Sequence, residues 1–194
     1  MKAETNYRVR LLEGLTQVLE SKTYREITLA DIAAAARVSR RTFYEHFPSK
    51  DDCLLALADH TSKSMMVAVL KASSPTKTWP VLVRDITQAY LFFIESKPHL
   101  MRALYIDLAA LGESGVQMRR RVAEQFALFL QKQVEQQRTS NKALQPMSLL
   151  MSMALVAGIN ELILYELTEK KAGSLMELAP TAEQLIHRVA AGQQ

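Results

Sequence analysis

The apolar residues of this chain recur mostly at helical spacing, and no segment shows the sustained alternation that marks a strand. In the first helix, Leu11, Leu15 and Val18 fall on one stripe. We therefore expect an all-α protein with about nine helices. They are expected over residues 5–21, 29–36, 40–47, 50–72, 79–96 and 98–111, in a long helix ending near 138, over 146–167, and in a last helix ending near 191 that bends at 180.

The residues at the expected helix ends indicate how the short helices begin and stop. Thr28 is suited to cap the second helix, and Asp31 three positions later completes a capping box. Ser39 caps the third helix, Pro48 ends it, and Ser49 caps the fourth. Two short helices and a longer one thus follow one another closely, joined by tight turns.

Residues 28–50, TLADIAAAARVSRRTFYEHFPSK, have the pattern of two short helices that cross closely. Small and apolar residues such as Ile32 and Ala36 can pack against Phe43 and Phe47, which lie one turn apart. The opposite face of the second helix then presents two adjacent arginines and a tyrosine. This is the arrangement of a helix-turn-helix whose second helix enters a DNA major groove.

Each polar residue of this motif has a predicted role on DNA. Arg40 and Arg41 are expected to read bases, because a guanidinium donates two hydrogen bonds to guanine, worth about 1–3 kcal/mol of discrimination. Phosphate contacts are expected from the hydroxyl, imidazole and ammonium groups of Thr28, Ser39, Thr42, Tyr44, His46 and Lys50. Glu45 lies one turn after Arg41; an ion pair with it is favoured over a direct contact with cytosine.

The motif resembles the helix-turn-helix of the tetracycline-repressor (TetR) family of bacterial transcription regulators over roughly residues 8–55. The family usually has glycine where this chain has Arg37, so Arg37 must either accept a strained left-handed turn or adopt another one. The residues that carry the resemblance are Thr28, Ile32, Ala33, Ala36, Val38, Ser39, Thr42, Tyr44, Phe47, Ser49 and Lys50.

The resemblance implies a helix-turn-helix DNA-binding domain over residues 1–50 and a helical effector-binding and dimerisation domain over 51–194. It further implies a homodimer on a palindromic double-stranded DNA operator, and a repressor released by a small, largely apolar molecule. An alternative keeps the DNA binding, but lets the C-terminal domain bind a protein partner. An open apolar cavity would argue against that alternative.

The second part of the chain offers candidates for a ligand pocket and for a dimer interface. Aromatic residues and methionine on its central helices are pocket candidates: Tyr90, Phe93, Met101, Tyr105 and Phe126. The helix that begins near residue 146 is apolar nearly all round, which predicts that it is buried on two sides, one of them against a second copy of the chain. The dimer candidates on it are Ala154, Ala157, Gly158 and Glu161.

Asn160 and Glu161 interrupt that apolar helix, and buried polar groups need partners. They can find them across a dimer interface or against a ligand, and the dimer is favoured. The interruption also leaves an apolar run shorter than the ~20 residues that span a bilayer, so no membrane segment is expected.

Composition narrows the class of protein further. The 194 residues carry a net charge of +4, and residues 1–50 hold nine basic and six acidic residues, so most of the excess lies in the motif. The single cysteine, Cys53, excludes an internal disulfide, and no signal peptide is expected; both favour a cytoplasmic location. No metal-ligand spacing, phosphate loop or catalytic arrangement is present, so we expect neither an enzyme nor a cofactor.

Overall fold

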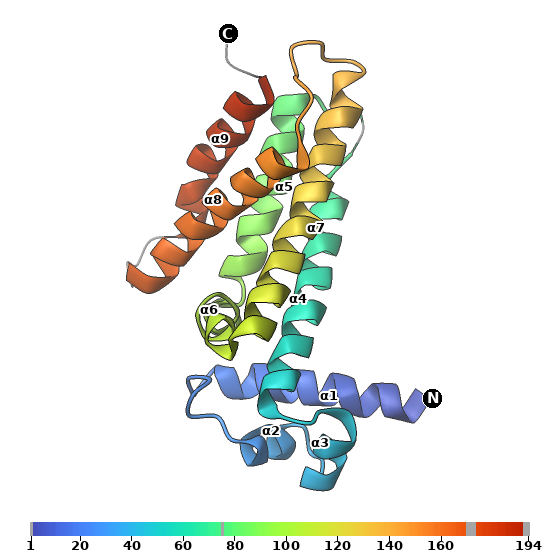
Figure 1. Ribbon diagram of the computed structural model, residues 1–194, viewed down its shortest axis with the longest axis vertical. Coiled ribbons are helices and arrows are strands. Elements are labelled where there is room, and N and C mark those ends of the chain that lie inside the picture. Colours follow the sequence, from blue (N-terminus) through green and yellow to red (C-terminus); the bar gives the residue numbers. More distant parts are fainter. Residues whose placement is uncertain (1, 75, 170–173, 192–194) are drawn as a thin grey trace. The chain divides into compact units, whose positions relative to one another are not determined.

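The computed structural model describes residues 2–74, 76–169 and 174–191, with side chains from residue 7 onward. This part of the chain is all helical, as predicted, and holds nine α-helices and two short 3-10 helices (Figure 1). Their bounds are α1 Lys2–Leu19, α2 Leu29–Ala35, α3 Arg40–His46, α4 Lys50–Ala72, α5 Trp79–Glu95, α6 Pro98–Ile106, η1 Asp107–Leu111, α7 Glu113–Arg138, α8 Leu149–Glu169, η2 Leu175–Leu178 and α9 Ala179–Ala191.

Three features of the helices differ from the prediction for local reasons. The helix expected over residues 98–111 changes to a 3-10 helix at Asp107 and ends at Gly112, whose φ is 63°. Helix α8 begins at Leu149 rather than at residue 146, because the Ser148 hydroxyl accepts the backbone N–H of Met151. Pro180 does not bend α9. It lies in the first turn, where backbone N–H groups have no acceptor within the helix, so the N–H that proline lacks is not needed there.

The chain divides into two compact units, and each combines segments that are distant in sequence. One unit contains the residues up to Thr61 together with Pro98–Arg119, and the other contains Ser62–Lys97 and the residues from Arg120 onward. The boundary predicted at residue 50 concerns function and stays a prediction. The division into compact units falls later in the sequence, after Thr61, because α4 continues past residue 50 without interruption.

The first unit is built around a close crossing of α1 and α2. Leu11, Leu15, Ile32 and Phe43 are fully buried in its core. At the crossing, a Cβ placed on Gly14 would lie 2.9 Å from the backbone nitrogen of Ala36, closer than real Cβ contacts come. Glycine is therefore required there by space, a constraint that the apolar pattern of α1 does not reveal.

Two described helices, α4 and α8, have the length and apolar composition of a membrane span, which by itself is weak evidence. Cys53, Leu54 and Leu57 of α4 are buried inside the first unit, as expected of a core helix. Helix α8 is different, because large apolar side chains such as Leu150, 78 % exposed, lie on its outside.

Candidate nucleic-acid interface and apolar cavity

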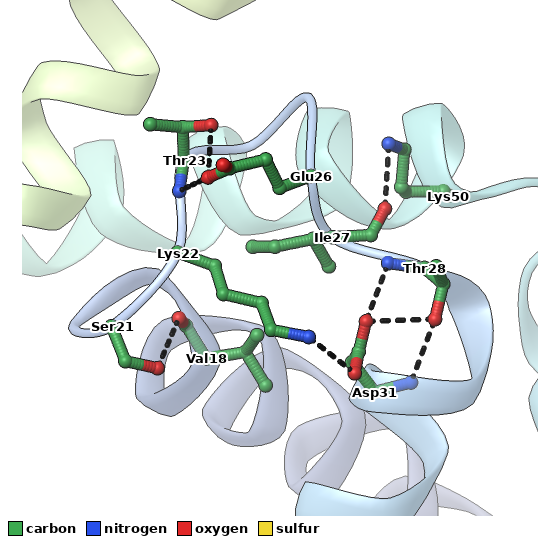
Figure 2. Close-up of polar contacts among 9 residues, drawn as sticks. All are labelled: Val18, Ser21, Lys22, Thr23, Glu26, Ile27, Thr28, Asp31 and Lys50. Carbon is green, nitrogen blue, oxygen red and sulfur yellow. Dashed lines mark hydrogen bonds and ion pairs between the residues drawn. The ribbon is translucent and has the colours of Figure 1, made fainter.

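The start of α2 is fixed by the predicted capping box. The Thr28 hydroxyl accepts the backbone N–H of Asp31 at 3.2 Å, and an Asp31 carboxylate oxygen accepts the Thr28 backbone N–H at 2.8 Å (Figure 2). Lys22 donates to the other carboxylate oxygen at 2.8 Å. The Lys22 ammonium group makes the largest contribution to lowering the pKa of Asp31 well below its usual range, and the hydrogen bonds from Thr28 lower it further. The Thr28 hydroxyl, predicted to contact phosphate, is thus engaged in starting the helix.

The turn between α2 and α3 has the left-handed conformation, which is the strained one of the two alternatives predicted for Arg37. Arg37 has a φ of 54°, the left-handed region. Its N–H donates to Ala34 O at 3.0 Å, and the Val38 N–H donates to Ala33 O at 2.9 Å. These two bonds form a Schellman motif, the ending that normally takes glycine.

Arg10 of α1 binds this turn directly. One guanidinium nitrogen of Arg10 donates to the carbonyl oxygens of Ala36 at 2.6 Å and Arg37 at 2.9 Å. The carbonyls at the end of α2 thereby gain a charged donor. Sequence reasoning missed this role; the available signal was that Arg10 lies one turn before Gly14, on the same face of α1.

The left-handed turn leads to a stability prediction. Arg37→Gly is expected to stabilise the protein by about 0.5–1 kcal/mol. Glycine has no steric penalty in the left-handed conformation, and the larger backbone entropy that it loses on folding offsets only part of that gain. Urea unfolding of the free protein measures the change. Arg37→Ala, which keeps the Cβ, is the control and should bring no gain; an Arg37→Gly protein less stable than wild type would contradict the prediction.

Helix α3 presents the predicted polar face to solvent. Phe43 and Phe47 are buried beneath it, with ring centroids 5.8 Å apart, while Arg40, Arg41 and Tyr44 are exposed. Tyr44 is 60 % exposed, although its ring is large and mostly apolar. A short helix that holds two arginines and a tyrosine outward has the geometry of a DNA recognition helix.

Local hydrogen bonds order the start of α3 and its exposed face. The Ser39 hydroxyl accepts the Thr42 backbone N–H at 3.0 Å, and the two hydroxyls share a further bond of 3.0 Å. Arg41 pairs with Glu45 at 3.2 Å, as the favoured interpretation predicted. Arg40 makes no hydrogen bond or ion pair within the described residues. These polar groups are therefore arranged at the surface before DNA is present.

Residues of α1 extend this face beyond the predicted set. The rings of Tyr7 and His46 lie 6.3 Å apart, which places Tyr7 beside the C-terminal end of α3. The Arg8 guanidinium lies 4.7 Å above the ring of Phe47. Tyr7 and Arg8 are both exposed, so the candidate interface includes the first described side chains of α1.

Lys50 has partners inside the unit. Its ammonium group donates to the backbone carbonyls of Tyr24 at 3.1 Å and Ile27 at 2.8 Å, and lies 4.5 Å above the Tyr24 ring (Figure 2 shows the bond to Ile27). The Tyr24 hydroxyl donates to Asp51 at 2.5 Å. Burial of the phenol, and then its hydrogen bond to this carboxylate, raise the pKa of Tyr24. A phosphate would have to share the Lys50 ammonium with two carbonyls; sequence reasoning missed these bonds.

The second unit contains an apolar cavity that opens to solvent; its empty space, counted together with the solvent space at its mouth, is about 500 Å³. Helices α4, α5, α7, α8 and α9 all contribute; representative apolar residues are Val69, Ile86, Leu130, Ile159 and Ile186. Three polar residues, Thr87, Tyr90 and Asn160, complete the wall.

The cavity brings together only part of the predicted pocket set. Tyr90 and Phe126 are in its wall, with ring centroids 5.2 Å apart in an edge-to-face contact. Phe93 is not among the lining residues; its ring lies 5.0 Å below the Lys97 ammonium group. Met101 and Tyr105 belong to the other compact unit. Helical spacing identifies an inward face but not the cavity that the face borders, which is why three of the five lie elsewhere.

Asn160 also lies in the cavity wall, and its side-chain oxygen accepts the Tyr90 hydroxyl at 2.7 Å. The favoured assignment of Asn160 to a dimer interface is therefore replaced by the cavity alternative. Ala154, Ala157 and Glu161 lie on the exposed side of α8. Gly158, predicted to belong with them, is half-buried and faces Leu185 of α9; a Cβ there would lie 3.9 Å from that side chain.

The described His, Cys, Asp and Glu residues do not gather into a metal site. Among the described residues, no group of three or more His, Cys, Asp or Glu side chains could hold a metal ion. Cys53 is fully buried, and burial raises the pKa of its thiol to about 12, which keeps it protonated and unreactive at neutral pH.

Comparison with known proteins agrees with this geometry. Residues 11–57 match the family model of the bacterial regulatory proteins of the tetR family. The chain is 31 % identical over 122 residues to a nucleoid occlusion factor SlmA from Shewanella halifaxensis, covering 63 % of this chain and 61 % of that protein. The factor of the same name from Alteromonas mediterranea is 30 % identical over 123 residues, with 63 % and 62 % covered. The match thus spans about three fifths of these relatives.

Solved structures share the fold over nearly the whole chain. A bacterial regulatory protein of the tetR family from Rhodococcus RHA1 has a TM-score of 0.64 at 19 % identity, with 100 % of both chains covered. The transcriptional regulator FadR from Bacillus subtilis, solved in complex with stearoyl-CoA, has a TM-score of 0.77 at 13 % identity, with 96 % of this chain and 99 % of that chain covered.

Proposed function

Because the chain belongs to the TetR family of bacterial regulatory proteins, we propose that it binds a DNA operator as a homodimer and represses transcription until a small ligand releases it. The observation that carries the proposal is the exposed face of α3. Arg40, Arg41 and Tyr44 project from a helix whose start is capped and whose other face is buried. Rigid placement of a few donors is what base readout in the major groove requires.

A homodimer is supported by the exposed side of α8. Leu150 and Met151 are 78 % and 49 % exposed, and Ala154, Ala157 and Glu161 continue the same side toward the C-terminal end of the helix. Small residues allow a second helix to approach closely, and a contiguous apolar stripe on a surface favours a partner. Two copies would present two recognition helices to the half-sites of a palindromic operator.

Release by a small ligand is supported by the apolar cavity of the second unit. A ligand that binds better to a conformation unable to hold DNA must weaken operator binding by its differential affinity. The FadR structure shows that this fold can accommodate a ligand with a long apolar chain. These roles are compatible with a cytoplasmic protein that acts on chromosomal DNA.

A second candidate function has a specific observation in its favour. The relatives matched over three fifths of their length are nucleoid occlusion factors, so a DNA-bound protein with a protein partner is the alternative to ligand-released repression. The open apolar cavity favours the ligand, because a domain that serves only as a docking surface has no need of one.

Selection of bound fragments from host genomic DNA, at physiological salt and nanomolar protein, tests the proposal. We expect enriched fragments to share an inverted repeat whose half-sites lie one helical turn, or a multiple of it, apart. We also expect binding that weakens steeply with salt. Fragments without a common sequence would contradict operator binding. Fragments scattered along the chromosome, away from promoters, would favour the nucleoid occlusion role.

A further inference from the structure

We propose that the cavity of the second unit selects uncharged amphiphiles, that is, ligands with an extended apolar part and one neutral hydroxyl or carbonyl group. The inference deepens the proposed function, on which its biological meaning rests, by naming the chemical class of the ligand. The neutral group is assigned to the Tyr90–Asn160 pair, and the apolar part to the remaining wall.

The residues that line the cavity offer no counter-charge to an ionised ligand. The eleven lining residues, all of them described, include eight apolar side chains and no Lys, Arg, His, Asp or Glu. A carboxylate or ammonium group drawn into such a wall loses its hydration and meets no opposite charge, so its transfer from water is strongly unfavourable. Charged head groups are therefore disfavoured inside the cavity, while their uncharged analogues are not.

The cavity wall also holds a fixed polar pair. The Tyr90 hydroxyl of α5 donates to the Asn160 side-chain oxygen of α8 at 2.7 Å, and the Tyr90 ring is held edge-to-face by Phe126 of α7. Both groups are neutral and hydrogen-bonding, so the hydroxyl or carbonyl group of a ligand can exchange with the bond that joins them. Thr87, buried one turn before Tyr90, adds a third polar group to the same wall.

These two features together predict a preference order. An apolar wall alone would retain any hydrocarbon in proportion to its buried area. The polar pair adds a directional contact, which rewards a ligand with one matching neutral group and orients it in the cavity. Uncharged amphiphiles should therefore bind more tightly than anions or cations of the same chain length.

The test uses the full chain and the neutral fluorescent probe N-phenyl-1-naphthylamine, displaced by decan-1-ol, decanoate or decylamine at pH 8. We expect decan-1-ol to displace the probe at a concentration at least about tenfold lower than decanoate or decylamine. Equal or tighter binding of decanoate or decylamine would overturn the proposal. Failure of the wild-type protein to bind either the probe or decan-1-ol would overturn it as well.

Two variants test the polar pair. Tyr90→Phe and Asn160→Leu should each weaken decan-1-ol binding by about threefold to tenfold, the effect of one lost hydrogen bond. Tyr165→Phe is the matched control, because Tyr165 is 51 % exposed on α8, is not a lining residue and loses the same hydroxyl. Unchanged affinity in both cavity variants would contradict the assigned pair. The order of the three wild-type displacements tests the proposal even if a variant fails to fold.

The displacement assay contains no DNA, so its failure and that of the proposed function can be told apart. Selective binding of decan-1-ol together with fragments that share no sequence would uphold the ligand class and contradict operator binding. A clear inverted repeat, together with no selective displacement by decan-1-ol, would uphold operator binding and contradict the proposed ligand class.

Discussion

A protein that carries both Arg40→Ala and Arg41→Ala is expected to lose most of its preference for its operator over unrelated DNA while it remains folded. Both side chains are exposed on α3, so their removal leaves no cavity. Each bidentate contact with guanine is worth about 1–3 kcal/mol of discrimination, and a dimer loses each contact twice. The operator affinity should therefore fall by at least about a hundredfold.

The control for charge is Arg120→Ala together with Arg121→Ala. These arginines are also exposed and adjacent, but they lie on α7, outside the candidate interface. Both double variants lose two positive charges per chain, so a general electrostatic effect would weaken operator binding equally in the two proteins. Competition titrations of operator and scrambled DNA, at several salt concentrations, give the preference directly. A wild-type preference in the Arg40 and Arg41 variant would refute α3 as the reading helix.

Replacing Ala157 by glutamate is expected to convert the proposed dimer into monomers and, with it, to abolish tight operator binding. Ala157 is exposed on the side of α8 that we assign to the dimer interface, and Glu161 lies one helical turn away. A second carboxylate buried there would have no counter-charge, which costs about 3–5 kcal/mol. The dimer dissociation constant should rise by about two orders of magnitude or more.

Sedimentation equilibrium measures the dissociation constant, and circular dichroism checks that Ala157→Glu remains helical. Ala143→Glu is the control, since Ala143 is exposed in the connection between α7 and α8 and adds the same charge. A variant that dimerises as tightly as the wild type would place the interface elsewhere. A wild-type protein that is monomeric at operator-binding concentrations would contradict the homodimer itself.

Local sequence signals predicted the starts of α2 and α3 and the ion pair on α3, because each of these is decided over a few residues. The Thr28 and Asp31 capping box, the Ser39 cap and the Arg41–Glu45 pair each span three or four positions. Such contacts follow from helix geometry alone. The same residue types at the same spacing would predict them in any helical context.

Contacts between distant segments could not be predicted in this way. Arg10 reaches carbonyls 26 and 27 positions away, and Lys50 reaches back 23 and 26 positions to the chain before α2. The hydrogen bond from Tyr90 to Asn160 spans 70 positions. Periodicity shows that such side chains share a face with others, but the packing partner of that face is a property of the tertiary structure.

The hydrogen bonds from Arg10 to the turn between α2 and α3 matter when recognition modules are exchanged between related proteins. The segment that matches the family model begins at residue 11, one position after this arginine. A transplanted segment cut at that match would bring the left-handed Arg37 without the guanidinium that binds its carbonyl. The transferable module therefore begins upstream of the segment that the family model matches, and a graft meant to keep its DNA preference should include residues 7–10.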